Sequence, residues 1–157
     1  MNKELFKEMI EVIDQGYEFI EEYDNRTHQF DELLLYPVET HIIKIVGNHN
    51  EITTSEIARI LNRTVSACSQ ILKRLEQKGL IYKKKNPHNN RKYHLSLSEK
   101  GKNIFYQHDQ MEKEILKRYY QNMKMFNDEE LKIYIRIQKA LNQEYMIDIE
   151  ETVSEID

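Results

Sequence analysis

The sequence has few residues that break or cross-link regular structure: 157 residues include one cysteine, two prolines and four glycines. The single cysteine, Cys68, excludes an intramolecular disulfide and fits a reducing cytoplasm. Few prolines and glycines mean few turns, so we expect long elements. Long apolar runs are also missing. The N-terminal MNKELFKEMIEVIDQ is interrupted by charge every few residues, which is typical of neither a signal peptide nor a membrane span.

Apolar residues are scarce and charged residues abundant, at 39% and 32% of the chain. That balance suits a mainly helical protein with much exposed helix surface, or a protomer that buries apolar surface against a copy of itself. The length allows one compact domain or two small lobes. Catalytic motifs are not recognisable: we find no Gly-rich phosphate loop, no nucleophile elbow and no paired-cysteine zinc motif. We therefore expect no enzyme.

Positive charge is concentrated in one segment. Residues 57–95 contain ten Lys or Arg and a single acid, Glu76, for a net +9. The rest of the chain carries −13, which leaves the whole at −4. An acidic protein that gathers its cations in one segment favours a surface for a polyanion such as the DNA backbone, with salt-dependent binding. The alternative is a solvated basic face without a partner.

Helical periodicity predicts a first helix over 4–24 and, after a loop, a second helix from Pro37 to about Asn48. Thr53 with Glu56 forms a capping box that begins a short third helix. Its expected inward residues are Ile57, Ala58, Ile60 and Leu61.

A fourth helix follows the turn at Asn62-Arg63, with Thr64 as its N-cap and Gly79 at its left-handed C-terminal end. Its expected buried stripe is Val65, Cys68, Ile71, Leu72 and Leu75. The third and fourth helices together read as a helix-turn-helix.

Residues 81–85 and 91–97 then alternate as two strands around a tip at 86–90, and helices follow over 99–124 and from about Asp128. The acidic tail after Asp148 is expected to fray. The fold class is thus mainly α with a small β-hairpin. We expect a winged helix-turn-helix lobe at 37–98 and helical dimerisation regions at 1–36 and 99–157.

The fourth helix is expected to enter the major groove with its N-terminal turns facing base edges. Gln70 can bond an adenine edge in two places, Ala67 can touch a thymine methyl, and the more distant Lys73 and Arg74 suit phosphates. The predicted contacts on this helix are Thr64, Ser66, Ala67, Ser69, Gln70, Lys73 and Arg74. A polar exposed face on an ordinary helix is the alternative, and the ordered cap, turn, cap and glycine argue against it.

The hairpin supplies further cations. We expect Arg91 to enter a narrow A·T minor groove and the lysines to contact phosphates. The predicted contacts on the hairpin are Lys83, Lys84, Lys85, Asn89, Asn90 and Arg91.

The run from Ile52 to Gly101 resembles the DNA-binding lobe of MarR-type regulators, most specifically in LKRLEQKGLI (72–81) and LSLSEKG (95–101). The resemblance implies a triangular homodimer whose first and last two helices intertwine and whose two winged lobes read a palindromic operator. It also implies a ligand or metal, near the junction of lobe and dimer region, that changes DNA affinity. At the wing tip the chain departs from the family's frequent Asp-Arg-Arg, because an amide at Asn89 replaces the acid that would buttress Arg91.

Some members of that family sense zinc through a histidine on the second helix and an i, i+4 pair on the fifth. This chain resembles them at His41 and at His108 with Glu112, and Glu22 and His28 lie in the neighbouring region. Imidazole and carboxylate at such spacing suit Zn²⁺. The alternative is that these are surface or capping residues, and no cofactor is required by the sequence.

The sequence thus favours a cytoplasmic, homodimeric DNA-binding transcription regulator, a repressor, modulated by a small ligand or metal. Three alternatives stay open: a zinc-responsive regulator of the same fold, a winged-helix module that binds an acidic protein, and a metal-storage or small enzymatic helical protein. Cys68 also allows a redox sensor, although its place on the buried stripe favours an inert thiol.

Overall fold

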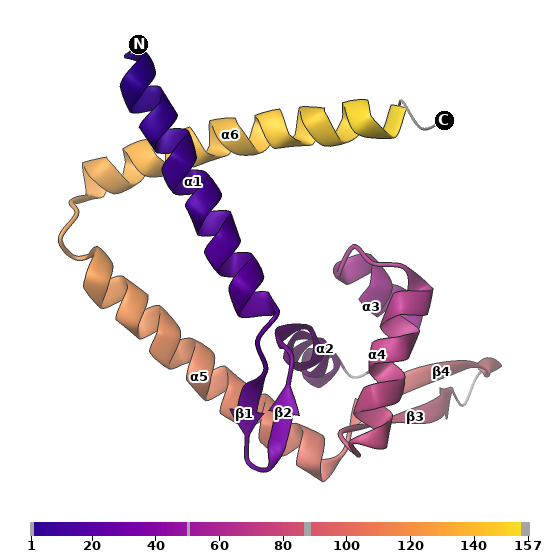
Figure 1. Ribbon diagram of the computed structural model, residues 1–157. Helices are drawn as coiled ribbons and strands as arrows, with labels where there is room; N and C mark the ends of the chain where they lie inside the picture. The colour runs from indigo at the N-terminus through magenta and orange to yellow at the C-terminus, as the bar shows by residue number, and fades with distance from the viewer. Residues whose placement is uncertain (1, 50, 87–88, 155–157) are drawn as a thin grey trace. The chain divides into compact units, whose positions relative to one another are not determined.

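The computed structural model describes residues 2–49, 51–86 and 89–154, without the side chains of 86, 89–92 and 150–154. The chain forms two compact units, residues 1–112 and 113–157, whose boundary lies within one long helix. In chain order the elements are α1 (Lys3–Asp24), β1 (His28–Phe30), β2 (Leu33–Leu35), α2 (Pro37–Asn48), α3 (Thr54–Ile60), α4 (Val65–Gln77), β3 (Ile81–Asn86), β4 (Asn89–Leu97), α5 (Glu99–Met123) and α6 (Asp128–Ser154) (Figure 1). This confirms the predicted mainly helical fold with a winged helix-turn-helix.

The segment between the first two helices is a small hairpin, where the sequence indicated a loop. Strands β1 and β2 pair antiparallel, with Phe30 opposite Leu33, around a tight turn at Asp31 (φ +50°). Asp31 Oδ2 accepts hydrogen bonds from the Asn103 and Gln107 side-chain amides of α5, each at 2.9 Å. These contacts, with the burial of Phe30 and Leu35, hold the hairpin against the lobe.

The helix-turn-helix forms as its caps predict. The Thr53 amide and hydroxyl donate to Glu56 Oε2 at 2.8 and 2.7 Å, and these bonds lower the pKa of the Glu56 carboxyl. Thr64 Oγ1 accepts from the Ala67 amide at 3.2 Å and begins α4. Gly79, with φ +70°, ends α4 in the left-handed region where a side chain would be strained.

Two expected inward residues are exposed instead. Ile60 and Val65 each keep 49% of their accessible surface. Ile60 is the last residue of a seven-residue helix, and Val65 opens the first turn of α4, so both lie beyond the packed part of the lobe. Leu61 is partly buried against the core, and the other predicted stripe residues of α3 and α4 are buried.

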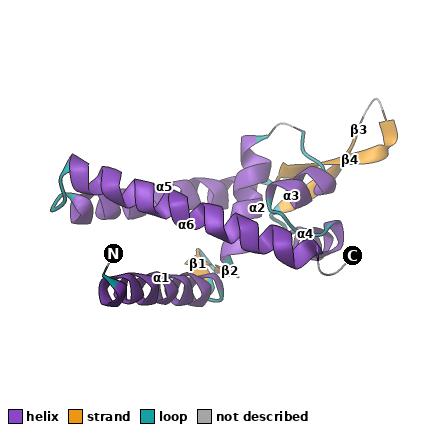
Figure 2. Cartoon of the chain, turned by 90° about the horizontal axis from the view of Figure 1, so that it is seen from above, coloured by secondary structure: helices purple, strands orange, loops and turns teal. Residues whose placement is uncertain are grey.

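The hairpin of β3 and β4 is antiparallel, pairing Ile81 with Leu97 and Lys85 with Tyr93, and its strands extend to Asn86 and Asn89. Residues 86, 89 and 90, which were predicted to belong to the tip, are therefore part of the strands. The Leu95 amide donates to the Ile52 carbonyl at 2.8 Å, which joins the hairpin to the segment before α3. Figure 2 shows the hairpin projecting beyond α3 and α4.

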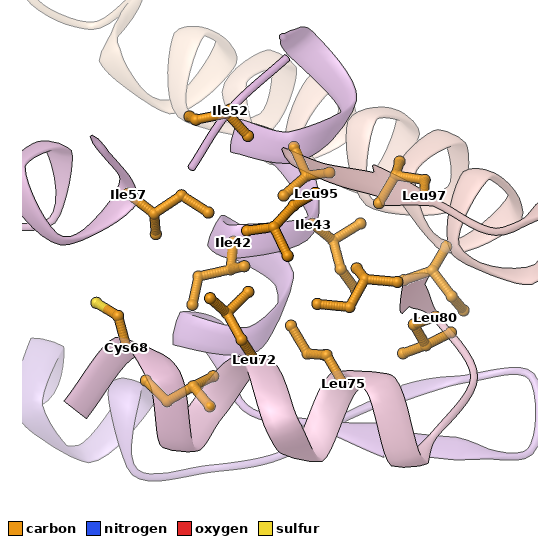
Figure 3. Packing of buried hydrophobic residues seen from close by; sticks show 14 of the residues in the cluster. Ile42, Ile43, Ile52, Ile57, Cys68, Leu72, Leu75, Leu80, Leu95 and Leu97 are labelled. Carbon is orange, nitrogen blue, oxygen red and sulfur yellow. The ribbon is translucent and has the colours of Figure 1, made fainter. Parts of the chain in front are cut away.

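One apolar core unites the helix-turn-helix, the wing base and the start of α5 (Figure 3). Side chains of α2, α4 and the wing strands point toward one another in this cluster, and Ile42, Leu72 and Leu95 are almost fully buried. Cys68 belongs to the same core, with no accessible surface. A packed core of this kind fixes the orientation of α4 relative to α2 and the wing.

The wing leads into α5 through a close backbone approach. Ser98 Oγ accepts from the Gly101 amide at 3.0 Å, confirming the predicted cap, and its hydroxyl also lies 2.6 Å from the Gly79 carbonyl oxygen. A Cβ on Gly101 would lie 2.0 Å from the Leu80 carbonyl oxygen. The glycine is therefore needed for this contact.

The terminal helices leave much apolar surface uncovered. Helix α1 has no buried residue among those described, and α6 continues to Ser154, past the Asp148 where fraying was expected. Exposed apolar side chains of α6 include Ile133, Ile135 and Ile149. No helix in the described part of the chain is long and apolar enough to cross a membrane.

Candidate nucleic-acid interface

Helix α4 presents one face to the core and the opposite face to solvent. Cys68, Ile71, Leu72 and Leu75 are buried, as the 3.6-residue period requires. The predicted DNA contacts Thr64, Ser66, Ser69, Gln70, Lys73 and Arg74 are exposed, and Ala67 is half-buried. The structure thus places all seven of these residues on or beside one accessible face, and their contact with DNA stays a prediction.

The wing lysines are exposed but not equivalent. Successive strand residues point to opposite faces, so Lys84 projects opposite to Lys83 and Lys85. Lys83 Nζ lies 2.9 Å from Glu76 Oε2 of α4, and this ion pair links the wing to the helix. Because Glu76 neutralises its charge, Lys83 is less available for the phosphate contact that was predicted for it. The side chains of Asn89, Asn90 and Arg91 lie outside the described residues.

Several cations on the lobe have no acidic partner. In the part of the chain that the structure describes, Arg63, Lys73, Lys84 and Lys85 are exposed and form no ion pair. They come from the turn before α4, from α4 itself and from the wing. A set of unpaired cations next to an exposed polar helix face is suited to phosphate contacts on both sides of a base-reading element.

Two residues of α4 bind a buried carboxylate that sequence reasoning did not connect to the site. Glu39 of α2 accepts from Lys78 Nζ at 2.9 and 2.8 Å, and Arg74 Nε lies 3.8 Å from it. Arg74 is therefore only partly available for the phosphate role expected of it. Glu39 carried a local signal, since an acid in the first turn of a helix is common, but its partners 35 and 39 residues away carried none.

The predicted metal ligands on α2 and α5 lie near one another. The rings of His41 and His108 are edge to face with centroids 6.2 Å apart, and His108 Nδ1 lies 3.8 Å from Glu112 Oε1. Burial lowers the pKa of His108, against the opposing effect of the Glu112 charge, and so favours the neutral imidazole. Glu112 also pairs with Lys44, a charge that competes with any metal.

The other two candidates are separate from this group in their contacts. Glu22 pairs with Arg26 on the surface, and the His28 ring packs on Tyr23 at 4.7 Å. His28 Nε2 is buried without a hydrogen bond. Among the described residues, no set of three or more His, Cys, Asp or Glu is arranged to hold a metal ion.

A half-open cavity of about 320 Å³ lies between the end of α2, the wing base and the start of α5. Val46, Leu97 and Phe105 give it an apolar wall, and Lys102 and Tyr82 add polar groups. Its volume is at the lower end of the range for small-molecule sites. Cys68 is fully buried, as expected for an inert thiol rather than a redox sensor.

Known proteins with similar sequences include DNA-binding regulators. Residues 35–93 match the sequence profile of the MarR family. The HTH-type transcriptional regulator PchR of Bacillus subtilis (strain 168) is 27% identical over 101 residues, which are 64% of this chain and 60% of that protein. The chain therefore spans about 60% of the length of this curated relative.

Solved structures share the fold over most of the chain. A zinc-responsive MarR family member, ZitR of Lactococcus lactis, superposes with a TM-score of 0.76 at 22% identity, covering 90% of this chain and 99% of that one. FabT of Streptococcus pneumoniae, solved in complex with DNA, gives 0.68 at 24% identity over 94% and 99%. The MarR family profile thus matches the lobe of this chain, and the winged helix-turn-helix fold is shared with solved MarR family structures along most of its length.

Proposed function

We propose that this protein is a transcriptional regulator, a repressor, that binds a palindromic DNA operator as a homodimer. The carrying observation is the exposed polar face of α4 flanked by the unpaired cations Lys73, Lys84 and Lys85. In this proposal Gln70 and the two serines of α4 read base edges, and the cations hold phosphates on either side. The DNA complexes among its structural relatives support the same reading of the fold.

The test is selection of bound duplexes from a random DNA pool, followed by affinity measurements at several salt concentrations. We expect a two-fold symmetric sequence with half-sites about one helical turn apart. The logarithm of the binding constant should fall linearly with the logarithm of the salt concentration, by about 0.9 per phosphate contacted. A winged-helix module that serves only protein contact, or a metal-storage protein, would enrich no sequence and shift no duplex at moderate salt.

The homodimer rests on exposed apolar surface. Leu5, Val12 and Phe19 are spaced by seven residues on α1 and each keeps more than 60% of its accessible surface. Such a stripe on a protein that is otherwise rich in charge is typical of a protein–protein interface. A second copy of the chain is the partner we propose for residues 1–36 and 99–157.

A metal-responsive version of this function is a second proposal. It is supported by the approach of His41 to His108 and of His108 to Glu112, three residues that would have to rearrange to hold a metal ion, and a zinc-responsive protein shares the fold. Zn²⁺ would displace Lys44 from Glu112 and should raise operator affinity. Zinc titration that leaves DNA binding unchanged, together with no loss of bound metal in His41→Ala/His108→Ala, would rule this version out.

A further inference from the structure

Glu39 is a buried carboxylate on which several groups converge from other elements. It lies in the first turn of α2, and its side chain is 1% exposed. Glu39 Oε2 accepts from the Tyr36 amide at 3.0 Å, and Lys78 Nζ donates to both carboxylate oxygens. Arg74 Nε stands 3.8 Å from Oε1. The carboxylate is thus shared between the start of its own helix and two cations of α4.

Lys78 fastens the end of α4 to this junction. It is the C-cap residue of α4, and its ammonium also donates to the Leu34 carbonyl oxygen of β2 at 3.2 Å. The C-terminal end of α4 is therefore held at one point to α2 and β2. Buried ion pairs add little net stability over an apolar contact, but they fix geometry, since a charge left unpaired is costly. This contact is a polar constraint on the orientation of α4, in addition to the apolar core.

Arg74 lies one helical turn before Lys78, and its side chain lies partly in solvent and partly against the buried carboxylate. Its side chain is 53% exposed, while its Nε faces the buried carboxylate. A guanidinium has five N–H donors, so one edge can face Glu39 and the other can face solvent or a phosphate. The negative charge of Glu39 attracts this cation toward the buried carboxylate.

We propose that Glu39 is a positioning residue for sequence discrimination, which sets the angle of α4 through Lys78 and withholds Arg74 from the DNA backbone. This role rests on the proposed DNA-binding function. Its consequence is unusual for a buried structural acid: removing its charge should weaken binding to the selected operator while strengthening binding to unrelated duplex. A residue that only stabilised the fold would weaken both.

The experiment compares wild-type protein with Glu39→Gln on two probes, the duplex selected from the random pool and a scrambled duplex of equal length. Binding is measured by fluorescence anisotropy, over a salt series, at a temperature where circular dichroism shows both proteins folded. We expect operator affinity to fall about 10-fold as base contacts are misaligned. We expect scrambled-duplex affinity to rise, with a salt slope steeper by about 0.9 per lobe as Arg74 gains a phosphate.

Two variants separate the parts of the mechanism. Arg74→Met should leave the wild-type salt slope almost unchanged, yet it should abolish the gain on scrambled duplex in the Glu39→Gln background. Lys78→Met should lose operator selectivity without that gain, because Glu39 then holds Arg74 alone. Glu129→Gln on α6 makes the same change in net charge at an exposed i, i+3 pair and should alter neither quantity.

The assignment would be overturned if Glu39→Gln kept the wild-type selectivity for the operator and the wild-type salt slope. It would also be overturned if Glu39→Gln lost affinity equally for the operator and the scrambled duplex. If Glu39→Gln does not fold, the two α4 variants decide: a shallower slope in Arg74→Met, or full selectivity in Lys78→Met, overturns it. A wild-type protein that enriches no duplex overturns the proposed function and this assignment with it. Failure of this assignment alone leaves wild-type operator binding intact.

Discussion

At the scale of single residues, Gly101 is the position where one added carbon should matter most. Its Cβ would lie 2.0 Å from the Leu80 carbonyl oxygen, and a backbone atom cannot move aside as a flexible side chain can. We expect Gly101→Ala to lower the free energy of unfolding by ~3 kcal/mol, because the start of α5 must shift away from the wing. Urea denaturation followed by circular dichroism measures this change.

Gly16 provides the matched control on α1. A Cβ there would meet no atom within 4 Å, and the residue lies inside a helix. Gly16→Ala should therefore raise helix stability by ~0.5–1 kcal/mol, since alanine loses less backbone entropy on folding. Equal unfolding energies for the two alanine variants would refute the close approach at Leu80.

His108 should make stability depend on pH. Burial lowers its pKa in the folded chain, so the unfolded chain, with the ordinary value of 6.5, binds the proton more readily. The folded state is therefore favoured above that value and loses stability as the pH falls below it, by up to ~1.4 kcal/mol per pH unit. His108→Gln should flatten this loss between about pH 7 and about pH 5 in chelator-treated samples.

Urea midpoints across that range measure the effect. The exposed His49, whose Nδ1 lies 2.6 Å from the Ile45 carbonyl oxygen, gives the control variant His49→Gln. That variant controls for the loss of one histidine at an exposed position. An unchanged pH profile in His108→Gln would show that its burial does not penalise the charged form.

At the scale of the element, the exposed face of α4 should divide into a part that discriminates and a part that only binds. Gln70→Ala should lower affinity for the selected operator by ~1–3 kcal/mol and relax sequence preference at one base pair of each half-site. Lys73→Ala should weaken all duplexes alike and reduce the salt slope by about 1 per lobe. Repeating the selection with each variant, with anisotropy titrations, distinguishes the two; identical profiles would reject the division.

The elements of the lobe were predictable because their signals are local. Thr53 with Glu56, Thr64 and Gly79 mark helix ends within a few residues, and each was found in its expected cap. The β1–β2 hairpin was missed because three-residue strands are too short to show alternation, and because it is held by hydrogen bonds from α5 to Asp31 and by the burial of Phe30 and Leu35. A local sequence pattern identifies an element that is stabilised by its own residues. It does not identify an element that is stabilised by residues far away in the sequence.

The DNA-facing residues of α4 were predicted as those that do not belong to its buried apolar stripe. Most of these residues are exposed in the structure. The pairing of Glu39 with Lys78 could not be derived in the same way, since two charges far apart in sequence give no sign that they meet. Val65 shows the converse error: periodicity includes it in the stripe, but nothing covers the first turn of α4. Whether a side chain at the end of a helix is exposed depends on which other elements of the fold pack against that end.

At the scale of the whole molecule, the uncovered face of α1 should determine both assembly and DNA affinity. Val12, between Leu5 and Phe19 on the stripe, is 63% exposed in the single chain, so a charge there disturbs the proposed interface without entering the core of the lobe. We expect Val12→Glu to shift the protein from dimer to monomer in sedimentation velocity. Loss of the second lobe should then reduce affinity for a two-half-site operator by about 100-fold or more.

Gln15→Glu adds the same charge to the same helix, on the side that carries its acidic residues, and should remain dimeric with wild-type affinity. A duplex with only one half-site completes the argument, because a single lobe suffices to contact it. Val12→Glu should bind that duplex as the wild-type chain does, since its α4 and wing are unaltered. Dimeric Val12→Glu with full operator affinity would mean that this face of α1 is not the contact that joins two copies.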